Sequence, residues 1–310
     1  MFYLQHFKGL FLLFTSCSLF LFSSCQSGVD GTAAPEEGQG TVTFSVTNYR
    51  QISFDDLSSS AATRATSSDA PSTLDHLLVA VFDAETGQQA CSPIQHDYDN
   101  YKSKPETYGQ FSIVLPYGHY RVLALGYNGR RKCNVASLNH ISWDDDFVPN
   151  TFLYCKEFTL DKDSNLDSEI TLRHVVSAFR VTAEDAIPSE LKKMRFSSTS
   201  GGTVLNALTG FTAQNTGRTW EIEVPTNYAG AQGVDFTVYL FLPANEINTS
   251  YTVQALGQNN SLLYEKLFND VPLHINVLTM WQGNFFEESA EEGISLYWDT
   301  QWADTITIDH

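Results

Sequence analysis

Short segments of alternating or continuously apolar residues recur along most of this 310-residue chain, and they constrain its fold more than any other feature. In TVTFSVTNY (41–49), Val42, Phe44 and Val46 fall on one face, and threonine and serine fall on the other. A period of two predicts a β-strand with one buried face. LDHLLVAVFD (74–83) is a continuous apolar run, short enough to be a buried strand of a sandwich.

Further strand-like segments follow at short intervals, with turn residues between them. FSIVLPYGHYRVLALGY (111–127) predicts a hairpin around Pro116-Tyr117-Gly118, and Asn259-Asn260 predicts a second tight turn. PSELKKM (188–194) is a short segment for which we expect a helix. Other predicted strands are 175–183, 220–225, 234–243, 250–257, 261–268 and 274–286. Many short strands with little helical periodicity predict an all-β protein of sandwich architecture.

Two polar stretches divide the chain after its first predicted strand. The segment 55–72 is rich in Ser, Thr and Ala, and we expect an exposed linker there. The acidic segment 160–169 lies near the middle, in a chain long enough for two domains. We therefore predict an N-terminal β-sandwich domain over 41–165 and a C-terminal one over 166–310, the latter with a terminal strand extension.

Residues 1–24 have the organisation of a lipoprotein signal peptide. An uncharged run of fourteen residues (9–22) is shorter than the ~20 residues that span a bilayer. Two serines then precede Cys25, which we predict to be acylated, with residues 25–40 as a tether. Cys17 is the competing cysteine, but it lies inside the apolar run. A plain cleaved signal peptide with an incidental cysteine is the alternative.

Composition and motifs point away from nucleic-acid binding and from catalysis. The chain has 36 acidic and 18 basic residues, a net charge of −18 that repels phosphate backbones. The motifs HExxH, GxSxG, Walker A and GxGxxG are absent from the sequence. The body cysteines Cys91, Cys133 and Cys155 lack zinc-site spacing, and a disulfide between two of them stays open. We predict no catalytic residues, no metal and no cofactor.

The linker suggests a mechanism of a different kind. It contains one basic residue, Arg64, and cleavage between Arg64 and Ala65 would separate strand 41–49 from everything after it. If Val42, Phe44 and Val46 pack in the first domain, their loss leaves a groove that another strand can fill. An uncut linker with an incidental arginine is the alternative.

The C-terminus offers a strand for such a groove. In residues 293–310, apolar side chains alternate with polar ones in two runs. The predicted donor residues are Ile294, Leu296, Trp298, Ile306 and Ile308. The same residues could instead pair within their own domain as its last strand.

The chain resembles the fimbrillin superfamily of Bacteroidales, most closely its lipoprotein anchor or minor-subunit branch. The resemblance is carried by the lipobox-like Phe22–Cys25, ATRA (62–65), LDHLLVAVFDAETG (74–87), LRHVVSAFRV (172–181) and VPLHINVLTMWQGNFF (271–286). It implies two tandem transthyretin-like β-sandwich domains, export as a lipoprotein, and assembly into surface fimbriae.

For this chain the resemblance implies a non-enzymatic fimbrial (pilus) subunit with a lipid anchor in the outer membrane. In stalk members a subunit's C-terminal strand fills the groove that proteolysis opens in its neighbour, whereas anchor members keep the lipid and stay uncut. The expected partners are other fimbrial subunits, joined by β-strand addition; a receptor for adhesion is not identified. The alternative function is a surface carbohydrate-binding lipoprotein, with Trp281, Trp298 and Trp302 as a sugar platform.

Overall fold

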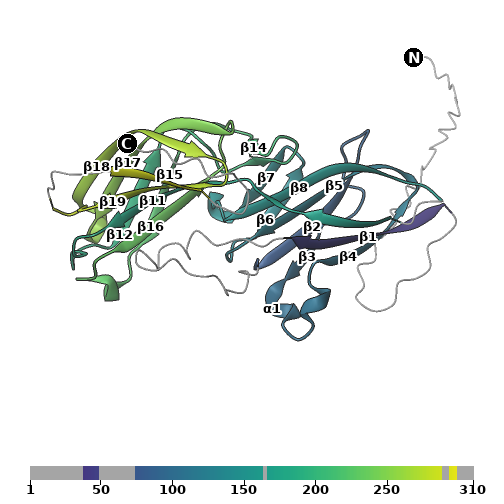
Figure 1. The fold of residues 1–310 in the computed structure, drawn as a ribbon, viewed down its shortest axis with the longest axis horizontal. Helices are drawn as coiled ribbons and strands as arrows, with labels where there is room; N and C mark the ends of the chain where they lie inside the picture. Colours follow the sequence, from purple (N-terminus) through teal and green to yellow (C-terminus); the bar gives the residue numbers. More distant parts are fainter. Residues whose placement is uncertain (1–37, 49–73, 163–165, 288–292, 299–310) are drawn as a thin grey trace, which may run out of the picture.

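The structure, a computed structural model, describes residues 38–48, 74–162, 166–287 and 293–298. It confirms the predicted all-β class. Figure 1 shows two lobes side by side along the long axis, one holding β1–β5 and the other holding β15–β19. The described helices are short and lie in connections: α1 (Tyr98–Tyr101), η2 (Pro105–Thr107), η3 (Asp144–Asp146), η4 (Thr226–Tyr228) and η5 (Gln258–Asn260). None of them has the length and apolar character needed to cross a bilayer.

The N-terminal lobe is a sandwich of two sheets. A three-stranded sheet of order β4-β1-β9 faces a five-stranded sheet of order β10-β8-β5-β2-β3, and one apolar core contains residues from both. Its strands are β1 (Gln39–Asn48), β2 (His76–Asp83), β3 (Ile94–Asp97), β4 (Gln110–Pro116), β5 (Gly118–Tyr127), β8 (Thr151–Leu160), β9 (Leu166–Thr171) and β10 (Arg173–His174).

The C-terminal lobe is a second sandwich with its own core. One sheet has the order β16-β11-β19-β20 and the other β15-β12-β17-β18. Its strands are β11 (Ser177–Ala183), β12 (Lys193–Ser198), β15 (Arg218–Glu223), β16 (Val234–Leu240), β17 (Glu246–Leu256), β18 (Leu262–His274), β19 (Val277–Gly283) and β20 (Gly293–Trp298). The predicted turn at Asn259-Asn260 is confirmed, because both residues adopt positive φ between β17 and β18.

A small sheet joins the two lobes. Its order is β14-β13-β7-β6, and within this sheet Leu205 of β13 pairs with Ile141 of β7. Its strands are β6 (Cys133–Ser137), β7 (His140–Trp143), β13 (Leu205–Asn206) and β14 (Phe211–Thr212). A third apolar cluster, which we call the interlobe core, surrounds this sheet and includes Trp143, Leu205 and Phe241.

Strand β2 shows why the apolar run 74–83 is continuous. Leu77, Val79 and Val81 belong to the core of the N-terminal sandwich. Leu78, Ala80 and Phe82 point the other way and belong to the interlobe core. Because successive side chains of a strand face opposite sides, a strand covered on both faces has no position left for a polar residue.

Three sequence expectations differ from the structure. Strands β4 and β5 turn at Tyr117 but lie in opposite sheets, so residues 111–127 form an arch between sheets and the predicted hairpin is wrong. Residues 188–194 form no helix; a turn closed by Leu191 N–H to Pro188 O leads into β12. Strand β9 pairs with β1 and β10 pairs with β8, so the chain stays in the N-terminal lobe past the expected boundary at 165.

In the described structure no disulfide joins any two of the three body cysteines. Cys91 and Cys133 are buried and Cys155 is partly buried. Burial raises the pKa of the Cys133 thiol to about 12 and that of Cys155 to about 11. Such thiols carry almost no thiolate at neutral pH and behave as small apolar residues.

Candidate strand-exchange site

Strand β1 is the central strand of its three-stranded sheet. It runs antiparallel to β4, with Val42 opposite Ile113 and Phe44 opposite Phe111. On its other side it runs parallel to β9, in a register that begins with Val42 opposite Leu166. Removing β1 would therefore leave two strands with unpaired backbone edges and a strand-wide gap between them.

The three apolar side chains predicted on β1 all enter the core. Their exposed fractions are 0% for Val42, 2% for Phe44 and 3% for Val46. The Phe44 ring meets the ring of Phe158 on β8 edge to face, with 5.6 Å between centroids. Burying each such side chain contributes ~2 kcal/mol, so β1 is held by its side chains as well as by its backbone.

Close packing at both ends fixes the register of β1. A Cβ at Gly40 would lie 3.1 Å from Leu160 Cδ1 and 3.3 Å from Tyr117 Cε1, so glycine fits best there. At the other end, Val46 N–H donates to Gly109 O at 2.9 Å, and Gly109 has a φ of +86°. A replacement strand must therefore offer a small residue at the Gly40 position and a backbone N–H at the Val46 position.

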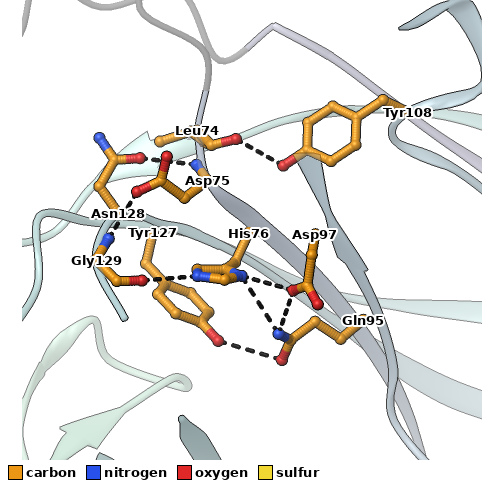
Figure 2. Close-up of polar contacts among 9 residues, drawn as sticks. All are labelled: Leu74, Asp75, His76, Gln95, Asp97, Tyr108, Tyr127, Asn128 and Gly129. Carbon is orange, nitrogen blue, oxygen red and sulfur yellow. Dashed lines mark hydrogen bonds and ion pairs between the residues drawn. The ribbon is translucent and has the colours of Figure 1, made fainter. Parts of the chain in front are cut away.

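The chain re-enters the described structure at Leu74, where a group of polar contacts holds it. Figure 2 shows the Tyr108 hydroxyl donating to Leu74 O at 2.7 Å. Asp75 is held twice, by its N–H to Asn128 Oδ1 at 2.9 Å and by Gly129 N–H to its Oδ2 at 2.8 Å. We call these contacts, together with those of His76 below, the Leu74 clamp.

His76 forms the second half of the clamp. Its Nδ1 lies 2.6 Å from Asp97 Oδ1 and its Nε2 lies 2.7 Å from Gly129 O (Figure 2). Both partners are acceptors, so the ring joins the end of β3 to the connection after β5 through hydrogen bonds. Burial alone would raise the pKa of Asp97, but hydrogen bonds from Gln95 and His76 outweigh it and lower that pKa below its usual value.

The clamp was not foreseen from the sequence. Its members come from the starts and ends of β2, β3 and β5 and from the connection after β5, so His76 and Gly129 are 53 residues apart. The one local signal is the pair Asp75-His76 at the start of an apolar strand. Polar residues there are equally typical of an exposed strand end.

The predicted donor segment is described only in part. Residues Gly293–Trp298 form β20, which pairs antiparallel with β19 so that Trp298 lies opposite Val277. In the isolated chain β20 is thus an edge strand of its own sandwich, which was the alternative open at the sequence level. Ile306 and Ile308 lie outside the described residues, as do Cys25, Arg64 and Ala65.

The described residues do not assemble a sugar platform from the predicted tryptophans or a metal site. Trp281 is 1% exposed and packs against Phe268 in the core, so it cannot contact a ligand there. Trp302 lies outside the described residues. Within the described part of the chain, no three His, Cys, Asp or Glu side chains gather as metal ligands would.

Several solved structures of Bacteroidales proteins resemble this chain, as the sequence resemblance predicted. An adhesin candidate from Bacteroides ovatus has a TM-score of 0.47 and 10% identity, over 78% of this chain and 88% of that one. A fimbrial assembly protein from Parabacteroides distasonis has a TM-score of 0.43 and 12% identity, over 83% and 94%. The tip fimbrial protein Mfa3 from Porphyromonas gingivalis has a TM-score of 0.39 and 11% identity, over 83% and 99%.

Those TM-scores lie below 0.5 and the identities are low, so these likenesses assign no function to this chain. No curated protein sequence matches it. The profile of one protein family, by contrast, matches residues 35–309, which include all the described strands. The chain belongs to this family, DUF6562, a family of unknown function.

Proposed function

We propose that this protein is a structural subunit of a surface fimbrium and that it joins its neighbours by strand exchange. The observation that carries the proposal is the position of β1. It is a central strand with one buried face, yet only the segment 49–73 connects it to the clamped body, and that segment contains Arg64. One cut there leaves β1 attached by non-covalent contacts alone.

The energetics favour replacement of β1 over simple loss. Val42, Phe44 and Val46 together contribute roughly 6 kcal/mol at ~2 kcal/mol each, and the backbone bonds to β4 and β9 add to this. An empty groove loses all of these contributions. A strand with alternating apolar residues recovers them, so a released β1 is exchanged for a neighbour's strand of similar pattern.

The segment 293–310 is the proposed donor. Its alternating residues Ile294, Leu296 and Trp298, followed by Ile306 and Ile308, match the alternation of β1. Deletion of 293–310 is expected to leave a folded chain that no longer joins neighbouring subunits, measured as loss of high-mass polymer from cells that produce it. Normal polymer from the truncated chain would contradict the proposal.

A reversible lock on β1 tests the acceptor half of the proposal. Thr43 lies directly opposite Ser112 across β1 and β4, so Thr43→Cys with Ser112→Cys is expected to close a disulfide and hold β1 in place. The oxidised variant should not accept a strand after cleavage at Arg64, and reduction should restore assembly. The matched control is Ser197→Cys with Thr219→Cys, which locks β12 to β15 and leaves β1 free.

We further propose that Cys25 is acylated and holds the protein on the outer membrane. In an anchor subunit β1 stays in place and the chain contributes only its C-terminal strand. In a polymerising subunit β1 leaves after cleavage. The intact mass of the mature protein distinguishes them: acylated Cys25 with residues 26–64 retained identifies an anchor, and a chain beginning at Ala65 identifies a polymerising subunit.

A further inference from the structure

A groove of about 310 Å³ lies where the two lobes meet. One wall comes from the N-terminal lobe, with Arg131, Asp145 and Phe147. The other comes from β15 and β16, with Arg218, Trp220 and Tyr239. Junctions of this kind, with an apolar wall and a few polar groups, are where small ligands most often bind. We call it the interlobe groove.

The two arginines of the groove are paired with weakly held carboxylates. Arg131 Nη1 lies 2.9 Å from Asp145 Oδ2, but the two side chains are 53% and 68% exposed. Arg218 Nη1 lies 3.8 Å from Asp146 Oδ2, and the Asp146 side chain is 74% exposed while that of Arg218 is 19% exposed. Ion pairs with a solvent-exposed carboxylate are weak, so an incoming carboxylate can displace Asp145 and Asp146.

Two further donors in the groove lining lack a partner among the described residues. They are Nε of Arg218 and Nε1 of Trp220, both buried. Buried N–H groups are nearly always hydrogen-bonded, because an unpaired one has lost its bonds to water without replacement. The Arg218 guanidinium carbon lies 5.8 Å from the centre of the Trp220 ring, so both donors belong to one corner of the groove. That corner has an excess of donors and suits a ligand with acceptor oxygens.

The remaining lining suits a ring with one apolar face. Phe147 is 38% exposed although it is a large apolar residue, and Val238 and Ile222 continue the apolar surface. At the rim, Glu221 is held by Arg195 and Lys193, whereas the exposed Asp145 carboxylate, paired with Arg131, has acceptor capacity left for a hydroxyl group. A carboxylate, hydroxyl groups and an apolar ring face occur together in an acidic sugar.

We propose that the interlobe groove binds a saccharide bearing a carboxylate, a uronic acid in its simplest form. Its carboxylate takes the place of Asp146 beside Arg218, and its ring lies against Phe147. The bidentate geometry of a guanidinium with a carboxylate gives the site its preference for acidic over neutral sugars. This inference is independent of strand exchange, because the groove is built from residues outside β1 and β20.

Isothermal titration of the full chain with D-galacturonic acid, D-glucuronic acid and the neutral sugar D-galactose tests the proposal. At least one uronic acid is expected to bind at least about tenfold more tightly than galactose. Arg218→Gln should weaken that binding by about tenfold or more, and Asp146→Asn should strengthen it. Arg121→Gln removes another ion-paired arginine, which pairs with Glu157 across β5 and β8 and is 27% exposed against 19% for Arg218, and it should leave binding unchanged.

Phe147→Ala is a second variant for the same test, since an exposed phenylalanine can be removed without unfolding the chain; it should weaken binding too. Melting temperatures of all variants establish that they are folded. Failure of both uronic acids to bind at millimolar concentration overturns the proposal. So does equal binding of galactose, or full retention of binding in both Arg218→Gln and Phe147→Ala.

Discussion

Phe44→Ala is the sharpest test of whether β1 is a separable strand. The Phe44 side chain is 2% exposed, lies in the core of the N-terminal sandwich and meets Phe158 edge to face. Truncating such a phenylalanine costs about 3–5 kcal/mol. Since each 1.4 kcal/mol is a factor of ten, the population of chains with β1 released should rise by roughly two to three and a half powers of ten.

Native-state hydrogen exchange of the β1 amides measures that population directly. The variant is expected to lose protection over residues 41–45 while the β12 and β17 amides keep theirs. A synthetic peptide with the sequence of residues 39–48 should then bind the variant faster than it binds the original chain, because the groove is open more often.

The matched control for this experiment is Phe196→Ala. Phe196 is 0% exposed on β12 and packs edge to face against Phe179, with 6.3 Å between centroids. The Phe196→Ala variant therefore loses a similar buried side chain, but from the C-terminal lobe. Phe196→Ala should not increase hydrogen exchange of the β1 amides. Equal loss of β1 protection in both variants, or none in Phe44→Ala, would show that β1 opens only with the whole protein, and the acceptor mechanism would fail.

Two further outcomes follow from buried and edge residues. Burial lowers the pKa of His96 and His174 from 6.5 to about 4, so between these pH values the unfolded chain binds protons that the folded chain does not. The free energy of unfolding should therefore rise with pH between about 4 and 6.5, by up to ~1.4 kcal/mol per pH unit per histidine. Urea denaturation across that range measures the slope, and His174→Gln should flatten it. Lys266 is on the edge strand β18, with its ammonium 4.5 Å from the Trp281 ring centre. Lys266→Val should leave an uncharged apolar edge and cause concentration-dependent association, measured by light scattering. A variant that stays monomeric would show that Lys266 is not what prevents edge-to-edge pairing.

Period-two alternation was sufficient to predict β1, because one face of β1 meets the core and the other does not. The continuous run in β2 was sufficient as well, since both of its faces are covered. The arch at Tyr117 was not predictable in the same way. A Pro-x-Gly turn signals only that the chain reverses, and whether β4 and β5 pair or separate into two sheets depends on β1, which takes the place beside β4.

The candidate sites differ in how far the sequence alone predicts them. The strand-exchange residues are local in sequence and could be named from pattern alone. The Leu74 clamp and the interlobe groove join residues from segments that lie dozens of positions apart, such as Asp146 and Arg218. Nothing in a local pattern distinguishes an arginine that will face another lobe from one that will face water. Such sites become visible only when the topology brings the segments together.

If β1 is exchanged as we propose, the arrangement of the cores explains how its lobe would stay folded. The five-stranded sheet has β1 and its neighbours on one face, but its other face is covered by the interlobe core through Leu78, Leu123 and Leu125. Removing β1 exposes one side of that sheet and leaves the other side packed against the second lobe. The Leu74 clamp does not involve β1, so it would still hold the start of β2 if β1 were removed. A single sandwich would lack this second support, so under the proposed exchange the two-lobed architecture would help the N-terminal lobe to tolerate the loss of its central strand.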